Sequence, residues 1–193
     1  MLDENQIYVI VDIETDGPVP GLYSMLSIGA VASTDTEQVS EFYRKITPYE
    51  EAKPDPDTME WWKAHPDVWA EVTTDAESPE VVMRDFLNWI KSLGAKPIFV
   101  AQPIEFDFNF VCWYLHKFVQ ENPFSDYTGI QRTLDMASFS AGKFNLPLSR
   151  ARGNQLPASF RDGMPEHSHK AIDDARGYGV ILRGILMSSP HIG

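Results

Sequence analysis

The sequence has one cysteine, few basic residues and no long apolar run, and each shortage excludes a class of protein. A single cysteine, Cys112, cannot form an internal disulfide, which excludes a small secreted domain stapled by disulfides. No apolar run approaches the roughly 20 residues that span a bilayer. The polar N-terminal stretch MLDENQ lacks the apolar core of a secretory signal. We therefore expect a cytoplasmic protein with no membrane partner.

The shortage of basic residues bears on nucleic acid as a partner. The chain has 16 Lys and Arg against 28 Asp and Glu, a formal net charge of −12, whereas phosphate binding usually relies on a basic face. The bases are not evenly spread, however. Between Ile130 and Arg161 the only acid is Asp135, and five bases lie there: Arg132, Lys143, Arg150, Arg152 and Arg161. This segment is either a solvated loop or a local phosphate-binding face.

The order of apolar patterns predicts an α/β fold. With 193 residues, 43% of them hydrophobic, the chain fits one domain, residues 1–193, with a core at about 7–187. Buried-strand patterns occupy residues 7–13, 26–33, 41–46 and 97–101, and helical patterns occupy 58–64, 66–72, 79–93, 106–119 and 168–186. The first three strands predict an antiparallel start to a mixed central sheet that continues with parallel strands and is flanked by helices.

An acidic pair ends the first predicted strand, in the stretch VIVDIETDG. Asp12 and Glu14 are two residues apart, so on a strand both side chains point to the same face. Two carboxylates on one face repel each other, and a divalent cation would turn that repulsion into coordination. Oxygen ligands suit Mg²⁺ or Mn²⁺ better than Zn²⁺. Acidic pairs at strand ends also occur without metal, so this pair alone leaves both interpretations open.

Two further acidic sites follow strand or loop segments. Asp107 starts an apolar helix, where it either stabilises the helix dipole or serves as a ligand. The stretch HKAIDDA places His169 five residues before Asp174, a rotation of about 140° on a regular helix. The two side chains can therefore converge only if His169 lies in the loop before the helix. His167, two residues earlier, is an alternative to His169 as the histidine that approaches Asp174.

In this order the three motifs resemble those of the DEDDh exonucleases, a group with the ribonuclease H-like fold. VDIET followed by Gly17 is similar to the first motif, Asp-x-Glu-Thr-x-Gly. AQPIEFDFNF is similar to the second motif, which ends in Phe-Asp, and HKAIDDA to the third, His-x-Ala-x-x-Asp-Ala. The resemblance spans about residues 7 to 187. The stretch Thr58 to Trp62 is also similar to a segment with paired tryptophans in a phage and mycobacterial branch, some of whose members are exoribonucleases.

The resemblance implies a metal-dependent 3′–5′ exonuclease that releases nucleoside 5′-monophosphates from single-stranded or short nucleic acid. It implies that two divalent ions, Mg²⁺ or Mn²⁺, are held by four carboxylates and that His169 is the general base. The implied ligands are Asp12, Glu14, Asp107 and Asp174. Family spacing selects Asp174 over its neighbour Asp173. The resemblance also suggests a homodimer, and the partner it implies is a 3′ end of RNA or DNA.

Substrate contacts are expected in two places. The loop after the first motif should line the site, through the backbone near Thr15 and Gly17 and through an apolar surface for the last base. The candidates for that surface are Tyr23, Met25 and Leu26. In the basic segment, Arg150 and Arg152 are expected to contact phosphates upstream of the scissile bond. Trp61 and Trp62 either pack in the core of a covering helix or supply a stacking surface for a base.

One departure and two rival functions remain at this point. Many family members carry a His-Asn pair shortly before the Phe-Asp of the second motif, where this sequence has Gln102 and Pro103. All four carboxylates are present, so the departure concerns the substrate rather than catalysis. The first rival is a hydrolase of dinucleotides or other small nucleotide phosphodiesters. The second is a non-catalytic nucleic-acid-binding scaffold on the same fold.

Overall fold

A mixed sheet forms the centre of the molecule. The computed structural model describes residues 5–165 and 168–189. Across these ranges the sheet has the spatial order β3-β2-β1-β4-β5. Its strands are β1 (Gln6–Thr15), β2 (Met25–Ser33), β3 (Gln38–Lys45), β4 (Lys96–Ala101) and β5 (Thr133–Asp135). β1, β2 and β3 pair antiparallel, whereas β4 runs parallel to β1 and to β5, which confirms the predicted mixed sheet.

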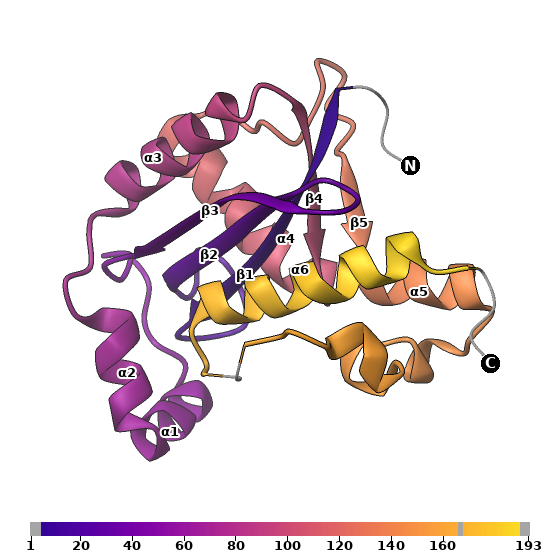
Figure 1. Cartoon of the computed structure of the whole chain (residues 1–193). Helices are drawn as coiled ribbons and strands as arrows, with labels where there is room; N and C mark the ends of the chain where they lie inside the picture. Colours follow the sequence, from indigo (N-terminus) through magenta and orange to yellow (C-terminus); the bar gives the residue numbers. More distant parts are fainter. Residues whose placement is uncertain (1–4, 166–167, 190–193) are drawn as a thin grey trace.

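Helices cover both faces of this sheet. They are α1 (Pro56–Ala64), α2 (Pro66–Thr73), α3 (Pro79–Ser92), α4 (Ile104–Tyr114), α5 (Met136–Phe144) and α6 (Ala171–Met187). α3 and α4 lie on one face and α5 and α6 on the other, while α1 and α2 form a hairpin at one end of the sheet (Figure 1). None of the helices in the described ranges combines the length and apolarity needed to cross a membrane.

The alternation of β1 decides which way its acidic residues point. Val9, Val11 and Ile13 pack into the core cluster shared with α3 and α4, whereas Ile10 packs into the cluster shared with α6. Because side chains two residues apart share a face, Asp12 and Glu14 lie on the Ile10 side, toward α6. The acidic pair therefore continues a buried apolar row at the end of β1.

Several local features differ from the sequence-based expectation. α1 begins two residues before Thr58, and its N-cap is Asp55, whose carboxylate accepts the Thr58 N–H at 2.8 Å. The Phe106 to Val119 helix starts earlier, at Ile104, and its last turn, Leu115–Val119, is a π-helix. α6 starts only at Ala171, which leaves His169 in the preceding loop.

The segment before α6 is irregular. It contains three short 3₁₀ turns, Leu148–Arg150, Gly153–Gln155 and Ala158–Arg161. This basic segment packs against α6 through Phe160, whose ring belongs to the same apolar cluster as Ile181 and Ile185. The bases of the segment thus sit on a backbone anchored to α6.

Candidate active site

Carboxylates from β1, α4 and α6 meet at the carboxyl end of β1. One carboxylate oxygen each from Asp12, Glu14 and Asp174 lie within 4.8 Å of one another. Asp107, from the first turn of α4, is 4% exposed, and its Oδ1 accepts the backbone N–H of Ile13 at 3.2 Å. The structure therefore brings Asp12, Glu14 and Asp174 into one group, and it places the buried Asp107 next to them on the backbone of Ile13.

Gly29 explains how α6 comes close enough to β1. This residue lies on β2 directly opposite Asp12. A Cβ at Gly29 would lie 2.3 Å from the backbone carbon of Ala171 and 2.3 Å from the backbone nitrogen of Ile172, closer than real Cβ contacts allow. The missing side chain lets the first turn of α6 touch the sheet. Asp174, in that same turn, is placed beside the acidic pair as a result.

Asp16, the third carboxylate of the stretch VIVDIETDG, has a different role from Asp12 and Glu14. Asp16 is buried, and its side chain accepts the backbone N–H of Ser24, while its own N–H donates to the Ser24 carbonyl at 3.0 Å. These two bonds close the loop between β1 and β2. Asp16 is thus a structural carboxylate, whereas Asp12 and Glu14 are left facing α6.

Electrostatics show that the cluster holds more negative charge than it can balance by itself. Burial, then the neighbouring carboxyls Asp174 and Asp107, raise the pKa of Glu14 to about 8. Burial also raises the pKa of Asp107 to about 8, although the N–H of Ile13 partly opposes that shift. The pKa of Asp12 is raised well above its ordinary value by burial and by the other three carboxyls. Converging carboxylates of raised pKa fit divalent cations bound through oxygen.

His169 lies in the loop before α6, beside an aromatic cluster from α1. Its backbone is left-handed, with φ of 54°. The Trp61 ring meets the His169 ring edge-on at 5.2 Å between centroids, and the ring of His65, at the end of α1, stacks on Trp61 at 4.1 Å. Lys170 also pairs with Glu71 of α2 at 3.3 Å. The α1–α2 hairpin therefore contacts the loop that carries the predicted general base. His167 lies outside the described residues.

The two adjacent tryptophans differ in burial. Trp62 is 2% exposed, packs with Leu26 and Val72, and donates its indole N–H to the Thr15 carbonyl at 3.0 Å. Trp61 is 39% exposed. Trp62 is thus a core residue that holds α1 against the end of β1, whereas Trp61 leaves an aromatic surface open beside His169.

The structure contradicts the expectation that Met25 or Leu26 contacts the last base. Both side chains are fully buried, because β2 begins at Met25 and is covered on both faces there. Met25 packs into the core shared with α3 and α4, and Leu26 packs under the α1–α2 hairpin. Tyr23 lies over Gly17, where a Cβ would meet its ring at 2.3 Å. Tyr23 stays a candidate on position.

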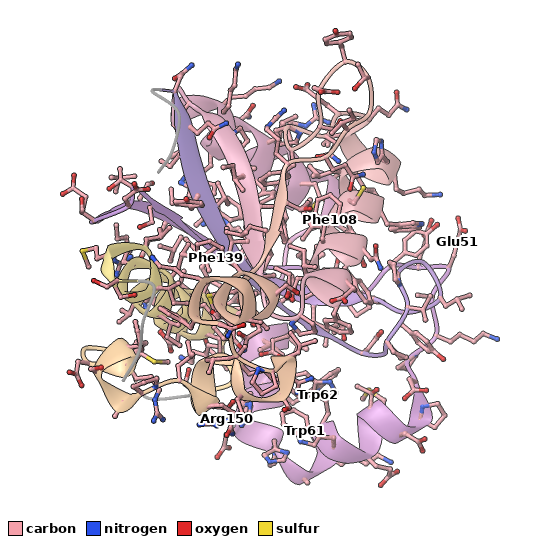
Figure 2. The ribbon with its side chains drawn as sticks, turned by 90° about the vertical axis from the view of Figure 1, so that its right-hand side faces the viewer. Glu51, Trp61, Trp62, Phe108, Phe139 and Arg150 are labelled. Atoms are coloured by element: carbon pink, nitrogen blue, oxygen red, sulfur yellow. The ribbon has the colours of Figure 1, made fainter. Side chains whose placement is uncertain are left out.

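The predicted arginines differ in whether they border the cavity next to the carboxylates. A cavity of about 640 Å³ borders Asp174, and Arg152 and Arg161 line it. Arg150 is exposed on the first 3₁₀ turn, at the same lower rim of the molecule as Trp61 (Figure 2). Gln102 accepts the Gly153 N–H at 3.2 Å, so the residue that departs from the family motif holds the basic segment to β4.

Sequence reasoning missed Gly29, His65 and Tyr178. Gly29 sits in an apolar strand, where a glycine often marks close backbone approach. The glycine could therefore have been noticed in the sequence. The segment that approaches it, the start of α6, is about 140 residues further along the chain, so the pattern around Gly29 could not identify it. Tyr178 follows Asp174 by four residues, hence on the same helix face, and lines the same cavity. His65 gave no signal, because only the packing of α1 turns it toward His169.

Comparison with known proteins agrees with this geometry. Residues 7–186 match the family described as 3'-5' exoribonuclease Rv2179c-like domain. The chain is 31% identical over 193 residues to the 3'-5' DNA exonuclease Cap18 of Escherichia coli, covering 95% of this chain and 93% of that protein. It is 26% identical to a PolC-type DNA polymerase III of Thermotoga petrophila, but covers only 11% of that protein.

Solved structures share the fold. The nuclease domain of 3'hExo, a DEDDh family member bound to rAMP, superposes with a TM-score of 0.69 at 11% identity, over 95% of this chain and 92% of that one. The zinc-bound complex of E. coli ExoI with ssDNA gives a TM-score of 0.64 at 18% identity, over 95% of this chain and 40% of that one. The ribonuclease H-like α/β fold is thereby confirmed. With the family match covering nearly the whole chain and the acidic site assembled, the protein belongs to the Rv2179c-like 3′–5′ exoribonuclease domain family and is a metal-dependent 3′–5′ exonuclease of the DEDDh type.

Proposed function

We propose that residues 1–193, with a core at about 7–187, form one exonuclease domain that removes nucleoside 5′-monophosphates from single-stranded 3′ ends. The observation that carries this proposal is the convergence of Asp12, Glu14 and Asp174 within 4.8 Å, beside the buried Asp107. Carboxylates held this closely, with raised pKa values, are suited to bind divalent cations at a phosphodiester.

The four carboxylates would hold two Mg²⁺ or Mn²⁺ ions, since all their donor atoms are oxygen. When bound, such ions supply Lewis-acid stabilisation of the charge that develops on the phosphodiester oxygens. His169 acts as the general base and takes a proton from the attacking water, because imidazole titrates near neutrality. The leaving group is the 3′-oxygen of the preceding nucleotide. Contacts of His169 with Trp61 and of Lys170 with Glu71 keep the loop in place.

The terminal nucleotide lies between the β1–β2 loop and α1. Backbone groups at Thr15 and Gly17 contact it, and the exposed face of Trp61 stacks on its base, with Tyr23 as a second candidate surface. A base–aromatic stack contributes about 1–3 kcal/mol and tolerates any base. Trp61→Phe should therefore raise KM with little change in kcat. A drop in kcat alone would assign Trp61 to holding His169 rather than to binding.

The strand upstream of the scissile bond runs toward Arg152 and Arg150, which contact its phosphates. The formal net charge of −12 repels the phosphates of a long strand. We therefore expect low processivity and poor cutting of duplex. The matching family is named for RNA and Cap18 for DNA, so the sugar is the main question for the substrate. The 2′-hydroxyl is the group by which a protein distinguishes the two.

A timed digestion tests the proposal. RNA and DNA strands of matched sequence, labelled at the 5′ end, are incubated with Mg²⁺, with Mn²⁺ and with EDTA. We expect a ladder that shortens from the 3′ end, that is lost with EDTA, and that is lost in Asp12→Ala and His169→Ala. The faster ladder identifies the sugar, and the faster metal identifies the ion.

A matched control comes from an acid far from the site. Glu80 is exposed in the first turn of α3, so Glu80→Gln should keep full activity. If wild type cleaves only substrates of up to about three nucleotides, the small-diester interpretation replaces ours. If neither strand is cut although metal raises the melting temperature, the scaffold interpretation does. Sedimentation of the active protein tests the homodimer that related enzymes suggest.

A further inference from the structure

Both neighbours of His169 in the chain are anchored to helices. The Ser168 hydroxyl donates a hydrogen bond to Oδ2 of Asp173, in the first turn of α6, at 2.6 Å. Lys170 pairs with Glu71 of α2 at 3.3 Å between Nζ and Oε1. His169 itself has a left-handed backbone, a sparsely populated conformation for a non-glycine residue that persists where the surroundings hold it. A carboxylate on either side therefore fixes the loop that carries the proposed general base.

Asp173 is in turn fixed by a connection that reaches β3. Its Oδ1 accepts a hydrogen bond from Nη1 of Arg176, about one turn further along α6, at 2.8 Å. The Arg176 guanidinium also makes two hydrogen bonds to the Glu41 carboxylate of β3, at 3.0 Å from Nε and at 2.6 Å from Nη2. Such a two-bond pair sets the plane of the guanidinium as well as its position. Asp173 thus has one oxygen tied to the sheet through Arg176 and the other tied to Ser168.

These contacts separate Asp173 from the adjacent Asp174. Neighbouring residues on a helix point about 100° apart, so the two acids face different surroundings. Asp174 joins Asp12 and Glu14 at the end of β1, whereas Asp173 bonds to Ser168 and to its own helix. An acid in a first helical turn can act on the helix dipole alone, but that role needs no partner in the preceding loop. The Asp173 side chain is 20% exposed and bonded at both oxygens, which distinguishes it from a solvated helix acid.

We propose that Asp173 is a positioning residue for the exonuclease reaction, acting through Ser168 to hold the His169 ring at the site. The inference rests on the proposed function, in which His169 takes a proton from the attacking water. The bond from Ser168 to Asp173 restrains the loop on one side of His169, and the pair of Lys170 with Glu71 restrains it on the other. Loss of the Ser168 bond should therefore slow proton transfer without changing how substrate or metal binds.

Ser168→Ala removes this hydrogen bond and leaves every charge in place. On a 5′-labelled oligonucleotide with Mn²⁺ we expect kcat to fall about ten-fold, as for loss of a hydrogen bond to a charged group. KM and the Mn²⁺ concentration that gives half the maximal rate should stay unchanged, and Ser168→Thr, which keeps the hydroxyl, should restore most of kcat. The matched control is Ser92→Ala, because the exposed Ser92 hydroxyl bonds to the Trp89 carbonyl of α3, and it should behave as wild type. Full kcat in Ser168→Ala, or a raised requirement for Mn²⁺, would overturn the proposal.

A double-mutant cycle shows whether the bond acts through His169. The His169→Ala protein is compared with one that carries both His169→Ala and Ser168→Ala, in single-turnover reactions with enzyme in excess, so that slow cleavage can be followed. Once the imidazole is absent, removal of the Ser168 hydroxyl should cause no further loss of rate, because residues that act through one group are not additive. A further loss of about ten-fold in the His169→Ala background would assign the bond to the fold of the loop and would overturn the proposal.

An observable that needs no activity separates this proposal from the function on which it rests. The His169 ring lies edge-on to Trp61 at 5.2 Å between ring centroids, so the ring current of the indole shifts the NMR signals of the His169 ring protons. In Ser168→Ala with Mg²⁺ we expect these signals to move toward those of a solvated histidine, while the signals of His65, stacked on Trp61, stay in place. Unchanged His169 signals would contradict the positioning role. If wild type cleaves no strand, the exonuclease function fails, whereas the NMR signals report on the positioning of His169 separately.

Discussion

The acidic end of β1 and the C-terminal part of the basic segment, from Leu148 to Arg161, are built in opposite ways. The acids come from regular elements, β1, α4 and α6, and their positions are fixed by backbone contacts such as Ile13 N–H to Asp107 and Gly29 to Ala171. The bases come from short 3₁₀ turns, and Arg150, Arg152 and Arg161 are all exposed.

This difference follows from what each group has to do. Carboxylates that share cations must be placed within a few tenths of an ångström, and strand ends and first helical turns provide that precision. Side chains that attract a phosphate act over several ångströms through solvent, so their backbone needs less regularity. The acidic end should therefore control the rate of chemistry, and the basic segment should control affinity.

The sharpest test of this contrast replaces one residue of each region. Asp174→Asn should lower kcat by more than about a thousand-fold, because it removes a charge that the reaction centre needs. Arg161→Gln should change kcat by only a few-fold and act on KM. Initial rates on one oligonucleotide give kcat and KM for both variants. Comparable losses of kcat in the two would contradict the view that the acids control the rate of chemistry and the bases control affinity.

A second test moves the acidic end without touching an acid. Gly29→Ala places a methyl group against the backbone of Ala171 and should destabilise the fold by about 1–3 kcal/mol, the usual cost of overpacking. The loss of activity should be larger than the loss of folded protein accounts for, because the added methyl group pushes the start of α6, and with it Asp174, away from Asp12 and Glu14. Gly142→Ala, in α5 with open space around its Cβ, is the control and should keep activity and match or exceed wild-type stability. Thermal melts and initial rates check both.

The third test uses pH on the metal-free protein. Glu14 and Asp107 have folded-state pKa values of about 8, above the ordinary value of about 4 in the unfolded chain. The folded state binds protons more tightly, so raising the pH from about 4 to about 8 lowers stability. We expect the melting temperature in EDTA to fall over that range, by about 2–4 °C per kcal/mol. Mg²⁺ or Mn²⁺ should restore it most at pH 8, and Glu80→Gln should behave as wild type. A melting temperature in EDTA that does not change with pH would contradict repulsion among the buried carboxylates.

The smallest effects are expected in the basic segment. Arg152→Ala and Arg150→Ala should each weaken binding of a long strand a few-fold and reduce the slope of log affinity against log salt by about 0.7 for each phosphate that is no longer neutralised. Arg152 should matter more, since it lines the cavity beside Asp174. Binding to the Asp12→Ala protein at several salt concentrations avoids cleavage during the measurement. Unchanged slopes would remove the arginines from the binding surface.

Local patterns predicted most of the elements, and they singled out the three acids that the structure groups at the end of β1, Asp12, Glu14 and Asp174. The first strand and its acidic pair could be predicted because alternation of side chains is a local property. The helical pattern at 79–93 likewise agrees with α3, which spans Pro79–Ser92. The apolar surface for the terminal base was predicted wrongly at Met25 and Leu26. Their burial depends on how the Asp16–Ser24 bonds close the loop and on the α1–α2 hairpin, and neither is visible in the local pattern.

The sequence by itself determined the order of most strands and helices, that Asp12 and Glu14 share one face of a strand, and the motifs that resemble those of the family. These follow from side-chain periodicity and motif spacing, which act over a few residues. Only the tertiary structure decided that Trp62 is core while Trp61 is exposed, that Gly29 admits α6, and that Tyr178 lines a cavity with Arg152. Each of these depends on a contact between segments distant in the chain, and such contacts are set by packing of the whole fold rather than by neighbouring residues.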